Sequence, residues 1–276
     1  MELVVFDLDG TLLNRHSEIS DFTAETLRLL SSRNIAYTLA TGRTFHGARA
    51  IVEGHGFALP QAYKNGVLIW HPEQQKYASS TTLTGSEVQH VVESFIQNEV
   101  TPFVFTLNQD NHTTVYHTPL RSEADQELVR ILDIDGHVTM RPLGELPPHA
   151  TVTHVNSIGS PDSVQAIVDH VDNEPHLVAY SGIASEGSTW HWLDIHHFNA
   201  SKGDALRTLK AELGLEKVIC FGDSDNDLSM FQMADEAYAP ENANERIKSA
   251  ATAVIGHHDE EGIARFLRER FSLDLL

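Results

Sequence analysis

The sequence predicts an α/β fold in which a parallel sheet is interrupted by an inserted α+β module. Short apolar runs over residues 3–6, 35–40 and 217–222 have the length of buried strands, and a helical pattern over residues 20–34 separates the first two. Strand, helix and strand at this spacing predict a right-handed parallel unit. From about residue 83 to residue 198 the pattern changes to helices that alternate with strands, which is typical of an α+β module.

The core elements follow from their residue types. Residues 3–6 are rich in β-branched and aromatic side chains, which favour a buried strand. The helix expected over residues 20–34 begins after Ser20, whose hydroxyl can cap the first turn. A second helix is expected over residues 201–215, with leucines along one face and with Gly214 placed to end it.

The insert is expected to contain helices and strands of its own. Its helices are expected over residues 85–99, 122–133 and 161–171, and its strands over residues 102–107, 113–117, 137–143, 151–159, 176–184 and 189–196. We therefore divide the chain into a first part of the core (residues 1–82), an inserted domain (residues 83–198) and a second part of the core (residues 199–276).

Composition limits the classes of function. The chain has 276 residues, of which 41% are hydrophobic, enough for one large or two modest globular domains. The formal net charge of −20 repels polyanions, so we expect no nucleic-acid partner. For the same reason, an anionic substrate would need local cations.

Length and cysteine content give the expected location of the protein. The apolar runs are no longer than a strand, so we expect no membrane span. Met1 leads directly into the first strand, which leaves no room for a signal peptide. The single cysteine, Cys220, has no disulfide partner and is expected to be buried. We therefore expect a cytoplasmic protein, and the sequence shows no sign of an obligate protein partner.

Two groups of conspicuous side chains have ordinary interpretations. The histidine pairs at residues 196–197 and 257–258 lack partners at metal-ligand spacing and are expected at the surface. Trp190 and Trp192 alternate on an expected strand, which favours packing within the insert over a sugar-binding platform.

Polar residues follow each of the three expected core strands. Asp7 and Asp9 follow the first strand, Thr41 follows the second and Asp223 follows the third. Open α/β sheets bind ligands at the carboxyl ends of their strands, so these side chains are expected to converge if the strands are neighbours. Lys202 begins the helix that leads into the third strand and can reach the same edge.

These residue types indicate phosphoryl chemistry. Asp7, Asp9, Asp223 and Asp227 would crowd carboxylates together, which is costly without a counter-charge such as Mg²⁺. One carboxylate can attack phosphorus, and a second can protonate the leaving oxygen and then activate water. Threonine, lysine and backbone N–H groups can stabilise the charge that develops on the phosphoryl oxygens.

The two aspartate-rich stretches, residues 7–9 and residues 222–227, each have a simpler structural interpretation when they are considered alone. Residues 7–9 would fit an Asx turn that closes a strand. Residues 222–227 would fit a loose calcium-binding loop, but the expected glycine and the distant glutamate are missing. The combination with Thr41 and Lys202 favours the phosphoryl-transfer interpretation.

The whole set resembles the haloacid dehalogenase-like phosphatase superfamily. The stretch DLDGT from Asp7 matches the nucleophile motif, Thr41 the second motif, Lys202 the third, and GDSDND over residues 222–227 the acidic fourth. The insert lies between the second and third motifs, and its strand order looks like a type IIB cap on a Rossmann-like parallel core. The resemblance covers essentially the whole chain and points to the Cof-type branch, whose members act on sugar phosphates and small metabolites.

The resemblance implies roles for the acidic residues. Asp7 would be the nucleophile and a metal ligand, and Asp9 would be the general acid and base, with its backbone carbonyl on the metal. Asp223 would be the third protein ligand of Mg²⁺. Thr11 would support the loop that positions Asp9, and Asp227 would orient either Lys202 or a metal-bound water.

The resemblance also implies a phosphate-binding set, which comprises Leu8, Thr41, Gly42, Arg43, Lys202 and Asn226. For Arg43 a substrate contact and a structural ion pair remain equally open. Asn65-Gly66 is the best hairpin signal in the chain, although the resemblance leaves open a place for Asn65 near the substrate. The stretch HHFNASKG, residues 196–203, departs from the glycine-containing approach to the lysine that the family pattern leads us to expect.

We therefore expect a Mg²⁺-dependent phosphomonoester hydrolase that acts on small phosphorylated metabolites through an aspartyl-phosphate. Two alternatives remain. A sugar phosphomutase of the same superfamily would return the phosphoryl group to its sugar rather than to water. A non-catalytic sugar-phosphate sensor would use the same pocket, but the intact set of Asp7, Asp9, Lys202 and Asp223 argues against it.

Overall fold

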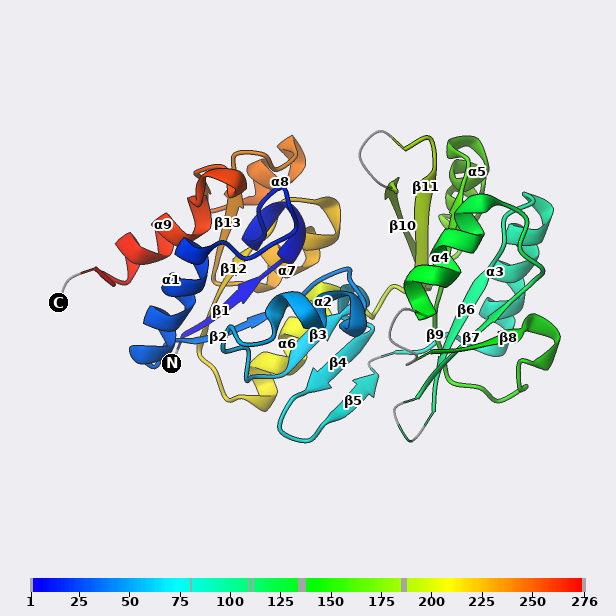
Figure 1. Ribbon diagram of the computed structural model, residues 1–276, viewed down its shortest axis with the longest axis horizontal. Coiled ribbons are helices and arrows are strands. Elements are labelled where there is room, and N and C mark those ends of the chain that lie inside the picture. The colour runs from blue at the N-terminus through cyan, green and yellow to red at the C-terminus, as the bar shows by residue number, and fades with distance from the viewer. Residues whose placement is uncertain are drawn as a thin grey trace. The chain divides into compact units, whose positions relative to one another are not determined.

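The structure is a computed structural model that describes residues 2–79, 81–108, 110, 112–133, 138–184 and 188–274. Contacts divide the chain into two compact units, which are drawn in Figure 1. Unit 1 consists of Met1–Ser80 and Ser201–Leu276, and unit 2 is Thr81–Ala200. Unit 2 begins two residues before and ends two residues after the insert expected at residues 83–198.

Unit 1 is built on a five-stranded parallel sheet with the strand order β14-β13-β12-β1-β2. Its strands are β1 Glu2–Phe6, β2 Ala36–Leu39, β12 Lys217–Phe221, β13 Glu236–Pro240 and β14 Ala253–Ile255. The central strand β1 pairs with β12 on one side and β2 on the other. The three core strands expected from the sequence are therefore neighbours, and their carboxyl ends meet at one edge.

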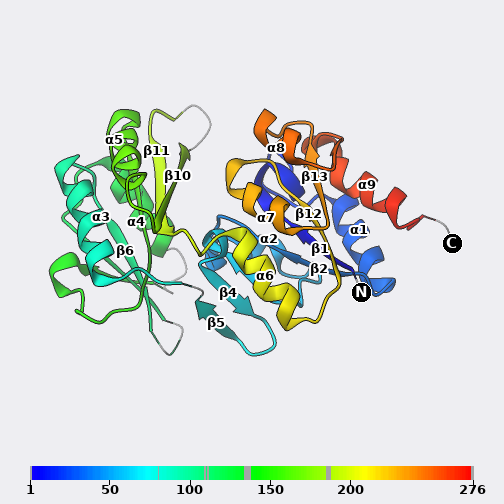
Figure 2. The same cartoon turned by 180° about the vertical axis from the view of Figure 1, so that it is seen from behind.

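Helices cover both faces of this sheet (Figures 1 and 2). They are α1 Asp21–Ser32, α2 Phe45–Val52, α6 Lys202–Glu212, α7 Leu228–Met233, α8 Glu245–Ala250 and α9 Gly262–Arg270. Val4 and Phe6 of β1 pack into the cluster that includes leucines of α1 and α9, whereas Leu3 and Val5 pack into the cluster of α6, α7 and α8. Because a parallel strand is buried on both faces, its sequence is a continuous apolar run rather than an alternating one.

The expected core helices are confirmed as α1 and α6. The hydroxyl of Ser20 accepts a hydrogen bond from the N–H of Thr23 and caps α1, as predicted. Ser201 caps α6 in the same way. Gly214 follows the end of α6 in the left-handed conformation, with φ of +61°, where glycine is the favoured residue.

A small antiparallel sheet in unit 1 contains the hairpin that Asn65-Gly66 predicted. Its strands are β3 Gln61–Tyr63, β4 Leu68–His71 and β5 Lys76–Ser79, with the short turn η2 Lys64–Gly66 between the first two. The connection is longer than a two-residue hairpin, because residues 64–67 lie between β3 and β4. All three residues of η2 have positive φ.

Unit 2 contains a six-stranded mixed sheet with the order β10-β11-β9-β6-β7-β8, in which only β7 and β8 pair in parallel among the described strands. The strands are β6 Phe103–Leu107, β7 Thr113–His117, β8 Val138–Pro142, β9 Val152–Gly159, β10 Leu177–Ile183 and β11 His191–His197. The helices are α3 Gly85–Gln97, α4 Glu123–Asp133 and α5 Pro161–Val171. Residues of α3 and α5 pack on one face of the sheet and residues of α4 on the other.

The burial of three side chains, Cys220, Trp192 and His196, can be compared with the positions expected from the sequence. Cys220 lies within β12 and is buried, as expected. Trp192 is half-buried on β11 and packs against Gly182 of β10. The expectation of a surface position for His196 is wrong, because His196 is fully buried. Neighbouring residues of a strand point to opposite faces of the sheet, so the pair at 196–197 cannot present both rings to solvent from β11.

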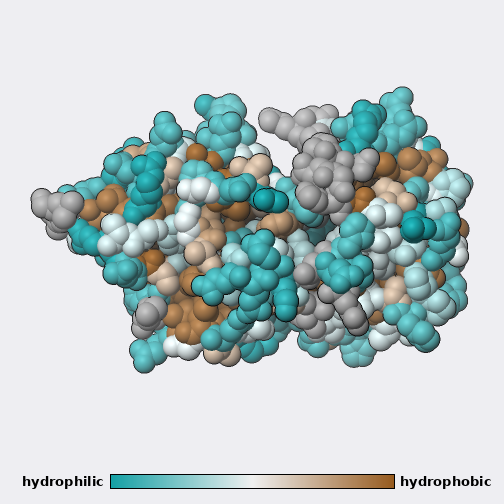
Figure 3. Space-filling model, turned by 60° about the horizontal axis from the view of Figure 1, so that its bottom comes forward, coloured by the Kyte–Doolittle hydropathy of each residue, from teal (hydrophilic) through white to brown (hydrophobic). Residues whose placement is uncertain are grey.

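The face drawn in Figure 3 is largely hydrophilic, with hydrophobic residues in separate patches. The described surface includes a few large apolar side chains, among them Ile131, Ile183 and Phe198. Within the described ranges, no helix combines the length and the hydropathy that a membrane span requires.

Candidate active site

The site is assembled where β1 and β12 end. Asp7 directly follows β1, is 5% exposed, and its N–H donates to the carbonyl of Phe221 at 3.0 Å. The chain then turns at Gly10, with φ of +71°. A Cβ on Gly10 would lie 2.6 Å from Oδ2 of Asp223, so only glycine allows this turn to pass so close to the end of β12.

Lys202 reaches the same edge from the first turn of α6. The residue is 0% exposed, and its Nζ donates to Oδ1 of Asp7 and to Oδ1 of Asp227, both at 2.6 Å. A fully buried ammonium is tolerated when carboxylates pair with it. The sequence-based expectation that Lys202 joins the strand-end residues is therefore met by direct contacts.

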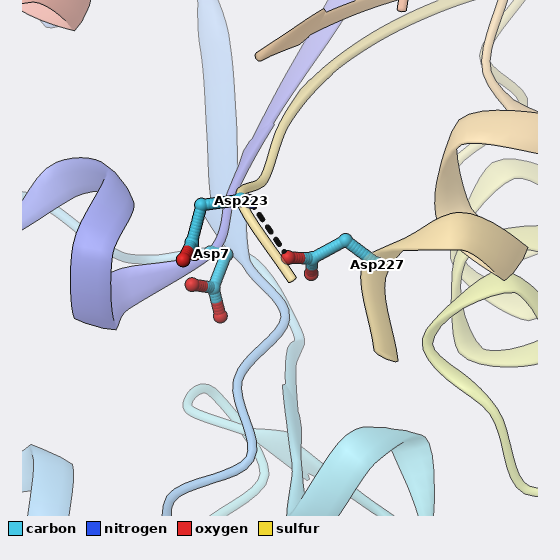
Figure 4. Close-up of side chains that lie close together, drawn as sticks. All are labelled: Asp7, Asp223 and Asp227. Carbon is cyan, nitrogen blue, oxygen red and sulfur yellow. Dashed lines mark hydrogen bonds between the residues drawn. The ribbon is translucent and has the colours of Figure 1, made fainter. Parts of the chain in front are cut away.

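Asp227 links the lysine to the turn after β12. Its Oδ2 accepts hydrogen bonds from the N–H groups of Asp223 at 2.9 Å and Ser224 at 3.1 Å, while its Oδ1 holds Lys202. Figure 4 shows the bond to the Asp223 backbone and the three carboxylates of Asp7, Asp223 and Asp227 turned toward one another. Of the two roles considered for Asp227, the geometry supports orientation of Lys202.

Three carboxylates surround one ammonium, so the site has an excess of negative charge. Burial, helped by Asp227 and Asp223, raises the pKa of Asp7 well above its ordinary value, although Lys202 acts in the opposite direction. Burial, together with the charge of Asp227, also raises the pKa of Asp223 to about 6. Burial lowers the pKa of Lys202, but the carboxylates of Asp227 and Asp7 outweigh it and the net shift is upward.

This arrangement fits a divalent cation. Asp7, Asp223 and Asp227 each offer a carboxylate oxygen, and these atoms lie within 4.8 Å of one another. Oxygen ligands and an excess of negative charge suit a hard ion such as Mg²⁺. Because both oxygens of Asp227 already accept hydrogen bonds, Asp7 and Asp223 are better placed to bind the ion.

Asp9 departs from the expected cluster of four carboxylates. Its side chain is 53% exposed and forms a two-point ion pair with Arg43, at 2.7 Å from Nε to Oδ2 and 2.6 Å from Nη2 to Oδ1. Nη1 of Arg43 donates to the carbonyl of Gly47 in α2 at 3.1 Å, which anchors the guanidinium. Asp9 therefore points to a cation on the neighbouring loop rather than to Asp7. Of the two roles left open for Arg43, the structure shows the ion pair.

Thr41 and Gly42 form the loop after β2. Thr41 is buried, and its Oγ1 accepts a hydrogen bond from the N–H of Arg43 at 3.1 Å, which closes a short turn. A Cβ on Gly42 would approach Oδ1 of Asn65 to 3.2 Å and Nδ2 of Asn226 to 3.7 Å. The structure thus brings Gly42 and Asn226 together as the sequence predicted, and it adds Asn65.

The structure adds detail to three sequence-based expectations. Thr11 donates to Oδ1 of Asp223 at 3.1 Å, a bond that ties the loop carrying Asp9 to the end of β12. The side chain of Leu8 is fully buried in the core cluster, so only its backbone remains for a ligand. Asn65 lies in the predicted hairpin turn, and its side chain also lies beside Gly42 and Asn226, which agrees with the place near the substrate that the resemblance left open.

The arrangement can support nucleophilic chemistry at Asp7. One oxygen of Asp7 is held by Lys202, and among the described residues no hydrogen-bond donor reaches the other oxygen. A carboxylate fixed in this way presents a lone pair in a defined direction. Lys202 contacts Asp7 directly, and Thr41 and Gly42 follow β2, the strand beside β1. An ammonium, a hydroxyl and a backbone N–H are groups that can bind an oxyanion.

Comparison with known proteins adds independent evidence. A model of the haloacid dehalogenase-like hydrolases matches residues 4–267. The chain is 27% identical over 280 residues to a 5-amino-6-(5-phospho-D-ribitylamino)uracil phosphatase of Bacillus subtilis, with 98% of each chain covered. It is 26% identical over 271 residues to the HMP-PP phosphatase of Serratia proteamaculans, with 96% of this chain and 94% of the relative covered.

Solved structures share the fold over nearly the whole chain. A crystal structure of a Thermotoga maritima protein matches with a TM-score of 0.76 at 25% identity, covering 97% of this chain and 96% of that one. A sugar phosphatase described as HAD subclass IIB matches with a TM-score of 0.74 at 18% identity, covering 99% and 100%. At that identity, the second match shows the fold alone, with its parallel core and inserted mixed-sheet cap.

Proposed function

The chain belongs to the haloacid dehalogenase-like hydrolase family and is a phosphatase of its Cof-type, subclass IIB branch, and from this premise we propose that it hydrolyses phosphomonoesters through an aspartyl-phosphate on Asp7. The observation that carries the proposal is the buried Asp7 carboxylate, with one oxygen held by Lys202 at 2.6 Å and the other unoccupied by any described donor. The substrates are sugar phosphates or similar small phosphorylated metabolites.

In the first step, the second oxygen of Asp7 attacks phosphorus as the bond from phosphorus to the leaving oxygen breaks. Asp9 donates its proton to that leaving oxygen, which departs as an alcohol. Lys202, the hydroxyl of Thr41 and the N–H of Gly42 hold the phosphoryl oxygens during the transfer. The product of this step is a phosphoryl group bound to Asp7.

In the second step, Asp9 takes a proton from a water molecule whose oxygen attacks the phosphorus. The bond from phosphorus to Asp7 then breaks, inorganic phosphate leaves, and Asp7 and Asp9 return to their starting states. Mg²⁺ would be held by Asp7, Asp223 and the backbone carbonyl of Asp9, and when bound it supplies positive charge that offsets the carboxylates and the phosphate.

Arg43 supports these steps through Asp9. The guanidinium of Arg43 donates to both carboxylate oxygens of Asp9, and these two bonds fix the direction in which the Asp9 side chain points. Proton transfer to the leaving oxygen requires one Asp9 oxygen to exchange its bond with the guanidinium for a bond with the substrate. The second bond can keep the carboxylate in place during that exchange.

The names of the relatives support the substrate class. The Bacillus subtilis relative is a phosphatase of a phosphorylated ribitylamino compound, and the Serratia relative is an HMP-PP phosphatase. Both named substrates are small phosphorylated molecules. We further propose that unit 2 supplies the selectivity for the leaving group, because the residues assigned to the chemistry all lie in unit 1.

The test is release of inorganic phosphate from a panel of sugar phosphates, nucleotides and aryl phosphates, with and without Mg²⁺. Asp7→Asn is the inactive variant. Asp225→Asn is the matched control, because Asp225 is an exposed carboxylate in the same loop as Asp223. Release that requires Mg²⁺ and Asp7, and that persists in Asp225→Asn, supports the proposal.

Three other outcomes would contradict it. Full activity in Asp7→Asn would place the nucleophile elsewhere. An isomerised sugar phosphate without free phosphate would indicate a phosphomutase. Tight binding of a sugar phosphate with no turnover would indicate a sensor.

A further inference from the structure

The turn η1 Leu8–Leu12 carries Asp9, which the proposed steps use as the general acid. Asp7, just before the turn, is fixed by the bond from its N–H to the carbonyl of Phe221 and by the bond from Lys202. Both carboxylates act on the same phosphate ester, so the separation between them must be defined. Other segments of the chain must therefore hold the backbone of η1.

Two segments at the same edge of the sheet supply these contacts. β13 and β14 run parallel to β12, so the residues that follow them lie at the carboxyl edge where the site is assembled. Asn242 follows β13, and His258 begins the short turn η5 His258–Glu260 after β14. Both residues are half-buried, and neither has a part in the steps proposed above.

The side-chain amide of Asn242 bridges the turns η1 and η5. Its Nδ2 donates to the carbonyl of Gly10 at 2.7 Å, and its Oδ1 accepts a hydrogen bond from the N–H of His258 at 3.2 Å. An amide suits this place because it offers a donor and an acceptor at the end of one short side chain. Gly10 directly follows Asp9, so the first bond fixes the peptide group next to the general acid.

The ring of His258 holds the other end of η1. Its Nδ1 donates to the carbonyl of Leu13 at 2.7 Å, directly after the turn. The neighbouring carboxylate of Asp259 extends the contact, because its Oδ1 accepts a hydrogen bond from the N–H of Arg15 at 3.1 Å. The nucleophile loop is therefore bound at Gly10 and again beyond its end by residues that follow β13 and β14.

We propose that Asn242 and His258 are positioning residues, which clamp the turn η1 and so keep the general acid Asp9 at a fixed distance from Asp7. This inference rests on the proposed function, and neither residue touches the substrate in this role. Asp7 is fixed independently by β12 and by the lysine of α6. Loosening the clamp should therefore displace Asp9 and leave the nucleophile in place.

The first test is Asn242→Asp, assayed at saturating Mg²⁺. Aspartate keeps the size of the side chain and the acceptor for His258, but it replaces the donor to Gly10 with a carboxylate oxygen that repels the carbonyl. A general acid contributes roughly 10²–10⁴-fold where the leaving group needs a proton, so its displacement should lower kcat/KM for phenyl phosphate roughly tenfold. The value for 4-nitrophenyl phosphate should stay within about twofold, because nitrophenolate leaves without a proton.

Asn244→Asp is the matched control, because it adds the same charge two residues away in the same loop. The side chain of Asn244 is exposed, and its Oδ1 caps α8 by accepting a hydrogen bond from the N–H of Ile247 at 3.0 Å. Aspartate accepts the same bond, so this variant should keep wild-type kcat/KM on both esters. Thermal melting compares the folding of the two variants.

A second pair of variants acts on the other end of the clamp and does not depend on the folding of Asn242→Asp. Asparagine places Nδ2 as many bonds from the backbone as Nδ1 of histidine, so His258→Asn can still donate to Leu13, whereas His258→Leu cannot. His258→Leu should show the loss that is specific to phenyl phosphate, and His258→Asn should recover most of it.

Three results would overturn the inference while the proposed function stands. Equal losses on both esters would show that the contacts maintain the whole site rather than the position of Asp9. The same loss in Asn244→Asp would assign the effect to the added charge. Wild-type kinetics in Asn242→Asp would show that the turn needs no clamp. If the wild type hydrolysed neither ester, the proposed function would fail first, and this inference would fail with it.

Discussion

The two units bury their polar residues in different places. Unit 1 buries Asp7, Lys202 and Asp227 beyond the ends of its parallel strands and at the start of a helix, and these residues pair directly with one another. Unit 2 buries polar residues within its strands, such as His154 on β9 and Asp194 on β11. In unit 1 the cost of burial is offset by the ion pairs of Lys202 with Asp7 and Asp227. In unit 2 the buried polar residues lie on one face of the sheet.

The strand register shows that shared face in unit 2. Asp194 lies opposite Asn156 and His154 lies opposite Phe105, so these residues share one side of the sheet, with His196 two residues beyond Asp194. The hydrophobic cluster with α3 and α5 contains instead Val155 of β9 and Leu193 and Ile195 of β11, together with Val152 at the start of β9. The contrast separates the residues assigned to the chemistry, which lie in unit 1, from a buried polar face within the sheet of unit 2. We expect variants in unit 1 to lower all activity and variants on the polar face of unit 2 to change selectivity.

The largest effect should come from Lys202→Met. Removing the ammonium leaves the buried carboxylates of Asp7 and Asp227 without their partner, and breaking a buried pair in this way costs about 3–5 kcal/mol. We expect phosphatase activity to fall by roughly 10³-fold or more, because Lys202 both holds Asp7 and binds the phosphoryl group. Activity assays and urea unfolding measure the two losses.

Lys210→Met is the matched control for this variant. Lys210 lies on the same helix and pairs with Asp235 at 3.1 Å, but near the surface. Such a pair contributes less than about 1 kcal/mol, and activity should not change. If both variants lost stability equally, the contrast between a buried strand-end cluster and an ordinary surface pair would be wrong.

These contacts also show what the sequence could and could not predict. Asp7, Thr41 and Asp223 could be placed together because parallel strands end at one edge, and Lys202 because its helix leads into β12. The direction of Asp9 could not be predicted, since it depends on Arg43 of another loop. A place for Asn65 near the substrate could be left open but not settled for a similar reason, because its partner Asn226 lies 161 residues away.

Burial within unit 2 was equally hard to predict. The expected strands were correct, but the face that each residue of β11 presents depends on its register with β9 and on what covers the sheet. His196 was therefore placed at the surface from its sequence, although it is buried. To predict that motifs at strand ends meet, it is enough to know the order of the elements. To predict which residues share a buried sheet face, the strand pairing must be known as well.

The next effect concerns Arg43→Gln, which frees Asp9 without changing Asp7. If Arg43 positions Asp9 as the general acid, the loss of kcat/KM should be larger for an ester whose leaving group needs a proton. We expect kcat/KM for phenyl phosphate to fall roughly 10–100-fold, and that for 4-nitrophenyl phosphate much less, because nitrophenolate leaves without protonation. Arg49→Gln, on the exposed side of α2, is the control. An equal loss on both esters would mean that Arg43 binds the phosphoryl group.

A smaller effect is expected from Asp194→Asn in unit 2. This change keeps the shape of a buried side chain and replaces its carboxyl group with an amide. We expect the order of preference among sugar phosphates to shift by roughly three- to tenfold in kcat/KM, while 4-nitrophenyl phosphate is little affected. Asp169→Asn, on the exposed side of α5, should change neither. A uniform loss on all esters would break the division of roles between the units.

The smallest effect is a pH-dependent stabilisation by Mg²⁺. Asp223 has a pKa of about 6 in the folded chain, above the ordinary value of 3.8, so the folded state binds its proton more tightly than the unfolded state does. Its contribution to stability is therefore complete below about pH 4 and is lost as the pH rises through 6. Protons and metal compete for the same carboxylates, so Mg²⁺ should restore stability above pH 6 and do little at pH 5.

Thermal melting with EDTA or with saturating Mg²⁺ at pH 5, 6 and 7.5 measures this competition. A ligand at 100 times its Kd stabilises by about 2.7 kcal/mol, which corresponds to a rise in Tm on the order of 5 °C for a chain of this size. The rise should be present at pH 7.5, nearly absent at pH 5, and absent at every pH in Asp223→Asn. A rise that did not depend on pH, or that persisted in Asp223→Asn, would place the cation away from the carboxylates at the end of β12. The acidic cluster of unit 1 would then be balanced by Lys202 alone, and its excess charge would have no partner in the proposed chemistry.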